Sequence, residues 1–267
     1  SSSENGIVNL PDDVDSLFSN VASRYTHIVA PNGDLIQFLI QDNFTVQQIL
    51  HTRRVLESYL TDIPDTDWGS DKSNIAIAMA ASNAIMFLLN DEDEYENPYI
   101  WDIFDSGVNG QDLLAIEVFP EGSSEYMNST ERDATYEEVL HFMHGYGVQL
   151  ALPAMQNAIE SAMLNAINND VYNPLSDLPE DDFDEEYFAM GLECYFGLWA
   201  HDPNGDGFCG DQEYAFITRE AMAIGDSALF AIINGYFGEA WEYTAVLPQG
   251  FNSNFFMKNQ EGLDYTY

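Results

Sequence analysis

The chain has 267 residues and carries 46 Asp and Glu against 7 Lys and Arg, a formal net charge of −39 at pH 7. This charge argues against nucleic acids and anionic membranes as partners, because both would be repelled, and it favours cations. The 46% of apolar and 13% of aromatic residues exclude a disordered acidic tail and are enough for a hydrophobic core.

The first half of the chain is predicted to hold a β-hairpin, two helices and a further strand. The sequence Pro31-Asn32-Gly33-Asp34 is a turn signal between two apolar, β-branched runs. Thr45, followed three residues later by Gln48, predicts the capping box of a helix. The predicted elements are strands over 26–30 and 35–41, a helix from 45 to about 60, a helix over 73–88 or a shorter helix running into a strand, and a strand over 113–119.

The second half is predicted to be helical. Thr135 is a candidate N-cap, and the acids at 137 and 138 suit the positive end of a helix dipole. The predicted helices cover 135–146, 153–168, 184–200 and 211–223. Helices outweigh strands, the strands lie early, and neither an internal repeat nor a linker interrupts the chain. The sequence therefore predicts a mostly helical α+β fold, with a single domain over 25–267 after an N-terminal extension, 1–24.

Residues 202–213 read Asp-Pro-Asn-Gly-Asp-Gly-Phe-Cys-Gly-Asp-Gln-Glu. An EF-hand loop needs oxygen ligands at positions 1, 3 and 5, a backbone carbonyl at 7, a Glu at 12 and Gly at 6. The expected calcium ligands are Asp202, Asn204, Asp206, the carbonyl of Phe208, and Glu213, with Gly207 at the sharp turn. The stretch resembles an EF-hand loop flanked by helical patterns, and a single loop indicates a structural Ca²⁺. The alternative is an Asp- and Gly-rich surface turn.

A second pattern lies in the helix predicted from residue 135. Glu137, His141 and His144 fall within about 60° of one another on one helix face. A carboxylate and an imidazole at i and i+4 can hold one metal ion, and the adjacent Glu138 is a candidate general base. The alternative is that the two acids only favour the helix N-terminus and that both histidines are core residues.

Two stretches resemble a known family. Glu137-Glu138-Val139-Leu140-His141 is similar to the His-Glu-x-x-His helix of zincin metallopeptidases, with Glu in place of the first His. Residues 184–191, Asp-Glu-Glu-Tyr-Phe-Ala-Met-Gly, resemble the third-ligand helix of gluzincins of the anthrax-lethal-factor type, Asp-Glu-Phe-Phe-Ala-Glu-Ala. The second Glu of that family stretch is Met190 here.

The resemblance implies a zincin-like domain with a small N-terminal β-sheet and an active-site helix. It implies Glu137, His141 and Glu186 as ligands of Zn²⁺ or another divalent transition metal, with His144 as a further candidate. It also implies that Glu138 is the general base that activates water for hydrolysis of a peptide or protein substrate. With two carboxylates, this ligand set is harder than the His₂Glu set of the family. The harder set favours manganese, iron or calcium.

The location of the protein is predicted from its apolar runs and its first residues. No stretch reaches the roughly 20 apolar residues that span a bilayer. An opening Ser-Ser-Ser-Glu without Met is typical of a trimmed mature form, so we expect a secreted or cell-surface protein. Cys194 and Cys209 would then form a disulfide or remain separate buried thiols.

The alternative to a peptidase or an impaired relative is a non-enzymatic calcium-binding or adhesion module with a decayed active site.

Overall fold

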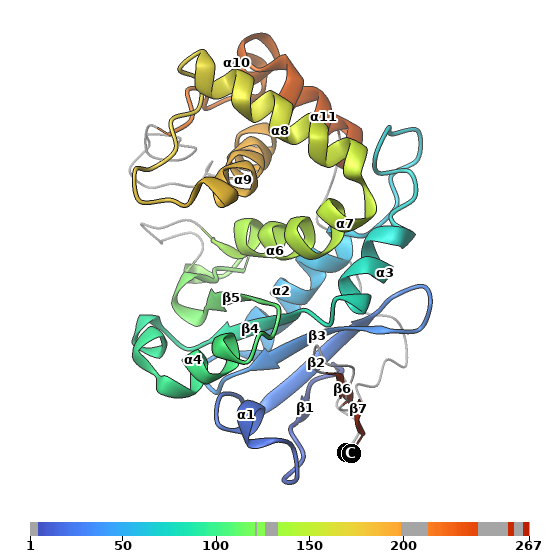
Figure 1. Ribbon diagram of the computed structural model, residues 1–267, viewed down its shortest axis with the longest axis vertical. Helices are drawn as coiled ribbons and strands as arrows, with labels where there is room; N and C mark the ends of the chain where they lie inside the picture. The colour runs from blue at the N-terminus through green and yellow to red at the C-terminus, as the bar shows by residue number, and fades with distance from the viewer. Residues whose placement is uncertain are drawn as a thin grey trace.

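The computed structural model describes residues 5–120, 122–125, 133–198 and 213–239, and the backbone of 256–258 and 264–266. It confirms an α+β chain that is about 53% helical with one small mixed sheet. The sheet occupies one end of the molecule, and α8, α10 and α11 occupy the other, with α6 and α9 between them (Figure 1). In the described part of the chain, no helix is long and apolar enough to span a membrane.

The early strands form a five-stranded sheet in the order β1-β2-β3-β4-β5. The predicted hairpin is confirmed: β2 and β3 are antiparallel, and Gly33 at φ 91° completes their turn. Strand β3 pairs parallel with β4, and β4 pairs parallel with the edge strand β5. The strands are β1 Val8–Asn9, β2 Arg24–Val29, β3 Leu35–Ile40, β4 Ile85–Leu89 and β5 Gly110–Leu114, with a separate antiparallel pair β6 Phe256–Lys258 and β7 Asp264–Thr266.

The helices cover both faces of this sheet and build the opposite end of the molecule (Figure 1). They are α1 Ser16–Ser19, α2 Val46–Tyr59, α3 Ser73–Ala81, α4 Pro98–Asp105, α6 Thr135–Met143, α7 Gln149–Ala151, α8 Pro153–Asn168, α9 Phe183–Phe196, α10 Arg219–Gly225 and α11 Ser227–Phe237. A π-turn, η3 His144–Val148, follows α6, and short 3₁₀ turns are η1 Glu92–Glu96, η2 Ala115–Glu117 and η4 Glu180–Asp182.

Two helix predictions are confirmed by local signals. Thr45 and Gln48 form the capping box of α2, in which each side chain bonds the other residue's backbone. Helix α8 covers the predicted 153–168. The predicted Thr135 cap is wrong, because Ala134 is the N-cap and the side chain of Asp133 accepts the Thr135 N–H at 3.1 Å.

Of the two predictions for residues 73–88, the shorter helix running into a strand is confirmed, and the single long helix is wrong. Helix α3 ends at Ala81, and Asn83 adopts φ 53°, a left-handed conformation that turns the chain into β4. All five residues of β4 are buried, and a strand covered on both faces has a continuous apolar pattern like that of a buried helix. The strand predicted over 113–119 is shifted, since β5 ends at Leu114 and η2 follows.

The helix boundaries around the predicted calcium loop are also corrected. Helix α9 ends at Phe196 rather than 200, because Gly197 adopts the left-handed φ of 62° that terminates helices. The helix predicted over 211–223 begins only at Arg219. Before it, Tyr214 forms a β-bridge with Tyr172. Helices α4 and α11 lie outside the predicted set.

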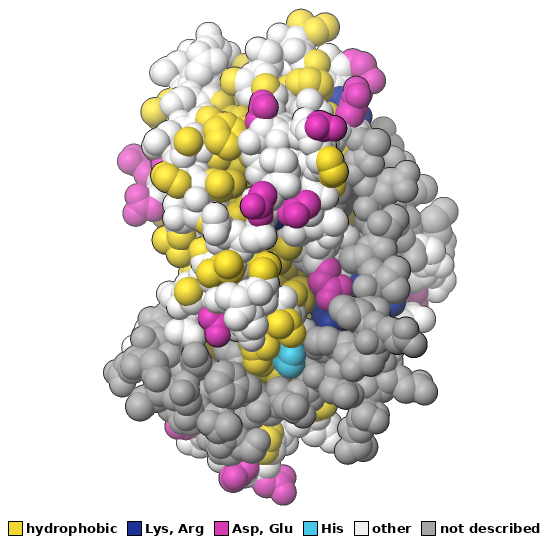
Figure 2. Space-filling model, turned by 90° about the vertical axis from the view of Figure 1, so that its right-hand side faces the viewer, with side chains coloured by type: hydrophobic (Ala, Val, Ile, Leu, Met, Phe, Trp, Pro, Cys, Tyr) yellow, Lys and Arg dark blue, Asp and Glu magenta, His cyan; other side chains and the backbone are white. Residues whose placement is uncertain are grey.

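Two hydrophobic clusters lie on opposite faces of the sheet. The larger joins the sheet to α2, α3, α6 and the helices of the far end. The smaller packs α1 and α4 on the other face and includes Phe18, so part of the predicted N-terminal extension belongs to the core. Among the described residues on the face shown in Figure 2, acidic side chains are scattered rather than gathered in one patch.

Candidate metal centre

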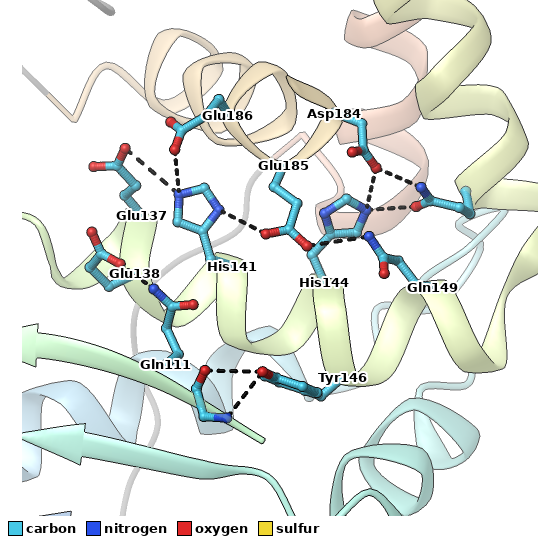
Figure 3. A network of polar contacts seen from close by, with 12 residues as sticks. Gln111, Glu137, Glu138, His141, His144, Tyr146, Gln149, Asp184, Glu185 and Glu186 are labelled. Atoms are coloured by element: carbon cyan, nitrogen blue, oxygen red, sulfur yellow. Dashed lines mark hydrogen bonds and ion pairs between the residues drawn. The ribbon is translucent and has the colours of Figure 1, made fainter. Parts of the chain in front are cut away.

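Helix α6 places the candidate site between two layers. It contacts α2 and β5 on one side and α9 on the other. Its start is held by a buried pair, in which His51 Nε2 of α2 lies 2.6 Å from Asp133 Oδ2. The opposite face of α6 presents Glu137 and His141 to the first turn of α9, which carries Glu186 (Figure 3).

The structure brings the three predicted ligand residues together. His141 Nε2 lies 3.8 Å from Glu137 Oε1 and 3.6 Å from Glu186 Oε1. One ligand atom from each residue lies within 4.8 Å of the others. Ligands at about 2.1 Å from a tetrahedral ion are about 3.4 Å apart. A divalent ion therefore fits this group after ligand movements of well under 1 Å.

The second nitrogen of the His141 ring faces a carboxylate from α9. Its Nδ1 lies 4.0 Å from Glu185 Oε2, and Glu185 Oε1 accepts a hydrogen bond from Gln149 Nε2 at 3.2 Å. A carboxylate on the far nitrogen is a common outer partner of a metal-binding histidine. Burial alone would lower the pKa of His141, but Glu137, Glu138 and Glu186 outweigh it and raise the pKa to about 10.

Glu138 points toward the sheet instead of joining this group. Its Oε2 accepts a hydrogen bond from Gln111 Nε2 of β5 at 2.7 Å (Figure 3). Burial raises the pKa of Glu138 to about 8; the neighbouring acids Glu137, Asp112 and Glu117 add to the rise, and His141 opposes it. A carboxyl group with a pKa near neutrality suits general acid–base chemistry.

His144, the further candidate ligand, lies outside the Glu137–His141–Glu186 group. The side chain is fully buried, and its Nε2 lies 2.7 Å from Gln156 Oε1 and 3.9 Å from Asp184 Oδ2. Gln156 also donates to Asp184 at 2.6 Å, so these side chains form their own buried network. The physical reason is the rise along the helix: His144 shares the face of His141 but lies about 4.5 Å further along the axis. There its ring meets Gln156 of α8 and Asp184 at the start of α9 (Figure 3).

A cavity of about 380 Å³ adjoins the site. Six carboxylates border it, together with His141, Gln111 and Tyr95. The acids are Asp112, Glu117, Glu138, Asp182, Glu185 and Glu186. Sequence reasoning missed Gln111, Asp112, Glu117 and Tyr95, because they come from β5 and the 3₁₀ turns beside the sheet, where no motif marks them. Glu185 adjoins the predicted ligand Glu186, and its contact with His141 depends on the packing of α9 against α6.

The predicted calcium ligands lie mostly outside the described residues. Asp202, Asn204, Asp206 and Phe208 belong to that part of the chain, as does Cys209. Glu213 is half-buried, and its backbone carbonyl accepts the Asn173 N–H at 2.7 Å. The calcium site therefore stays a prediction. Cys194 is buried, and its thiol donates to the carbonyl of Phe216 at 3.3 Å.

Comparison of the chain with protein-family models, with curated proteins and with solved structures finds no match. The geometry of the site therefore carries the functional argument alone.

Proposed function

We propose that the chain binds one divalent metal ion at Glu137, His141 and Glu186 and is a metal-dependent hydrolase of zincin-like architecture. One observation carries the proposal: ligand atoms from α6 and from α9 converge within 4.8 Å beside a cavity. The resemblance of residues 137–141 and 184–191 to the two zincin motifs supports peptide or protein as the substrate class.

Each residue has a distinct task in this proposal. A bound divalent ion supplies Lewis acidity, which polarises a carbonyl group and makes water easier to deprotonate. Glu138 accepts the proton of the attacking water at Oε1, the oxygen that is not bonded to Gln111. The carboxylate of Glu185, which accepts a hydrogen bond from Gln149, faces Nδ1 of His141 at 4.0 Å, while Nε2 faces the two carboxylate ligands.

The ligand set also constrains which metal would bind. Two carboxylates and one imidazole are harder and more negative than two imidazoles and one carboxylate. Such a set suits Mn²⁺ and Fe²⁺ as well as Zn²⁺. The Ca²⁺ predicted for residues 202–213 is a separate, structural proposal and requires no contribution from Glu137, His141 or Glu186.

Metal counting tests the proposal. Chelator-treated protein is incubated with excess Mn²⁺ or Zn²⁺ and one equivalent of Ca²⁺ per chain, so that any calcium loop is filled without excess Ca²⁺ competing for the three ligands. After dialysis, the Mn²⁺ or Zn²⁺ per chain is measured. We expect one equivalent of Mn²⁺ or Zn²⁺ in the wild type and none in Glu186→Gln. The control is Asp181→Asn, which removes the same charge at an exposed position shortly before α9 and should keep one equivalent. Absence of metal from the wild type, or equal binding by Glu186→Gln, would refute the site.

Hydrolysis of an unfolded protein such as casein tests the chemistry. Glu138→Gln should keep its metal and lose at least 100-fold in rate, as expected for removal of a general base. A wild type that binds metal without hydrolysing casein or a peptide library would favour the non-enzymatic binding module. Hydrolysis that is unchanged in Glu138→Gln would remove that residue from its assigned role.

A further inference from the structure

We infer that Gln111 is a positioning residue for Glu138, and that Tyr146 in the π-turn fixes the strand that carries Gln111. This inference rests on the proposed function, because it assigns Gln111 a task only if Glu138 acts beside a bound metal. Two contacts support it: Glu138 of α6 and Tyr146 of η3 each bond one of two adjacent residues of β5, Gln111 and Gly110 (Figure 3).

The first contact orients the carboxyl group of Glu138. Gln111 Nε2 donates to Glu138 Oε2 at 2.7 Å, and a side-chain amide nitrogen can only donate. With Oε2 engaged on the sheet side, the other oxygen points toward Glu137 (Figure 3). Glu138 and Gln111 both border the cavity next to the metal centre. The amide therefore fixes which carboxylate oxygen is available for a proton.

The second contact fixes the strand. The Tyr146 hydroxyl donates to the carbonyl of Gly110 and accepts the Gly110 N–H, both at 3.0 Å. Gly110 directly precedes Gln111 at the start of β5, where a Cβ would lie 2.5 Å from Cε2 of Phe87. Tyr146 thus bonds both the N–H and the carbonyl of Gly110, and Phe87 of the adjacent strand β4 leaves Gly110 no room for a side chain.

The π-turn explains how one helical segment serves both sides. His141 and Gln149 reach Glu185 of α9, whereas Tyr146, between them in sequence, reaches Gly110 of β5 (Figure 3). A π-turn inserts an extra residue into a helix and changes the direction of the side chains that follow, and such turns are frequent at functional sites. Here it links the element that supplies metal ligands to the strand that orients Glu138.

The first test uses metal-free protein and asks whether the two side chains are coupled. Melting temperatures are measured for the wild type, Gln111→Met, Glu138→Met and the double variant. Met is similar in length to both residues and forms neither side of the hydrogen bond. We expect the two losses to be non-additive, because each single substitution removes the same bond. Additive losses would show that the pair is uncoupled and would overturn the inference.

The second test reports on positioning in the metal-loaded protein without requiring an identified substrate. Acetohydroxamate chelates divalent ions through two oxygens and gives up a proton that a nearby carboxylate can take. We expect Gln111→Met to bind it about tenfold more weakly with unchanged metal content, because Glu138 loses the hydrogen bond that turns Oε1 toward the ligand. In a Glu138→Met background, the same substitution should have no further effect.

The controls separate a positioning role from a general structural one. Asn109→Ala removes a hydrogen bond to the Ser82 carbonyl at the entry to the same strand and should leave acetohydroxamate binding unchanged in both backgrounds. Gln111→Asn, one methylene too short to reach Glu138, should reproduce Gln111→Met. Tyr146→Phe should weaken binding in the same direction.

The outcomes distinguish failure of the proposed metal site from failure of the role assigned to Gln111. Wild-type protein that takes up no metal refutes the proposed function, and the inference fails with it. Wild-type protein that binds metal and acetohydroxamate, with an affinity that is indifferent to Gln111→Met, refutes the inference alone. Equal weakening in the wild-type and Glu138→Met backgrounds refutes it too, because the effect would not pass through Glu138.

Discussion

Lys72 offers a quantitative test of the packing between the start of α3 and the end of α11. Its side chain is fully buried at the start of α3, and within the described chain its Nζ has no hydrogen-bond partner. The ammonium lies 4.2 Å from the ring centroid of Tyr236 and 5.5 Å from that of Phe237. Burial lowers the pKa of Lys72 to about 7, although Asp62 opposes the shift. We predict that Lys72→Met stabilises the fold at mildly acidic pH.

The magnitude follows from the lowered pKa. A drop from 10.5 to about 7 corresponds to a cost of about 5 kcal/mol for the buried charge, and the cation–π contacts offset about 2 kcal/mol. Below the folded-state pKa both states hold the proton, so the cost is fully present. Between the two pKa values the unfolded state binds more protons, so the stability of the wild type rises with pH. Lys72→Met should therefore gain about 3 kcal/mol at pH 6 and less than half of that at pH 9.5.

Urea unfolding at both pH values measures the effect. The wild type and Lys72→Met are compared with Lys72→Arg, which keeps its charge at either pH and should be destabilised at both. A gain for Lys72→Met that is equal at pH 6 and pH 9.5, or larger at pH 9.5, would refute the claim that a buried charge is the cause. Destabilisation at pH 6 would show that the aromatic contacts outweigh burial.

Three further predictions concern other parts of the chain. Burial, aided by Arg53, lowers the pKa of His27 to about 4, so the unfolded state takes up the proton first as pH falls below 6.5. His27→Gln should thus flatten a loss of about 3 kcal/mol between pH 6.5 and 4 in unfolding titrations, and an unchanged slope would contradict this. A Cβ on Gly147 would lie 2.6 Å from Ile75 Cγ2, whereas one on Gly145 would meet only the carboxylate oxygen Oε1 of Glu185, at 3.1 Å. Gly147→Ala should lower the unfolding free energy by about 2 kcal/mol and Gly145→Ala by clearly less, and equal losses would count against the packing argument. Glu213→Gln should lower the melting temperature in calcium but not in chelator; equal effects in both would indicate a simple turn.

Local signals predicted much of the fold. The hairpin turn at Gly33, the capping box of α2 and the bounds of α8 depend on neighbouring residues, and each was predictable for that reason. Strand β4 was harder, because burial on both faces removes the alternation that distinguishes a strand from a buried helix. The residues after 213 were predicted as a helix, but the pairing of Tyr214 with the distant Tyr172 takes precedence there.

In the candidate site, too, the residues that depend on local sequence were predictable and those that depend on packing were not. Glu137 and His141 share a helix face at a spacing of four, so their proximity was visible in the sequence. Glu186 was found through its resemblance to a family motif, and the structure places it beside His141. The partners Gln111 and Glu185 depend on how β5 and α9 pack against α6, which no periodicity records. His144 shared the predicted face but belongs to a separate buried network.

The division of the ligand group between two layers has a consequence for local unfolding. Helix α6 is tied to the sheet layer at its start by Asp133 and His51, and just beyond its end by Tyr146 and Gly110. Glu186 belongs to α9 on the other side, so an ion bound by all three ligands would bridge the layers. Opening of α9 away from α6 would then have to release the ion, and each increase in metal concentration would make that opening rarer. Amide hydrogen exchange along α9 would slow as metal is added, while exchange in the β2–β3 hairpin would stay unchanged.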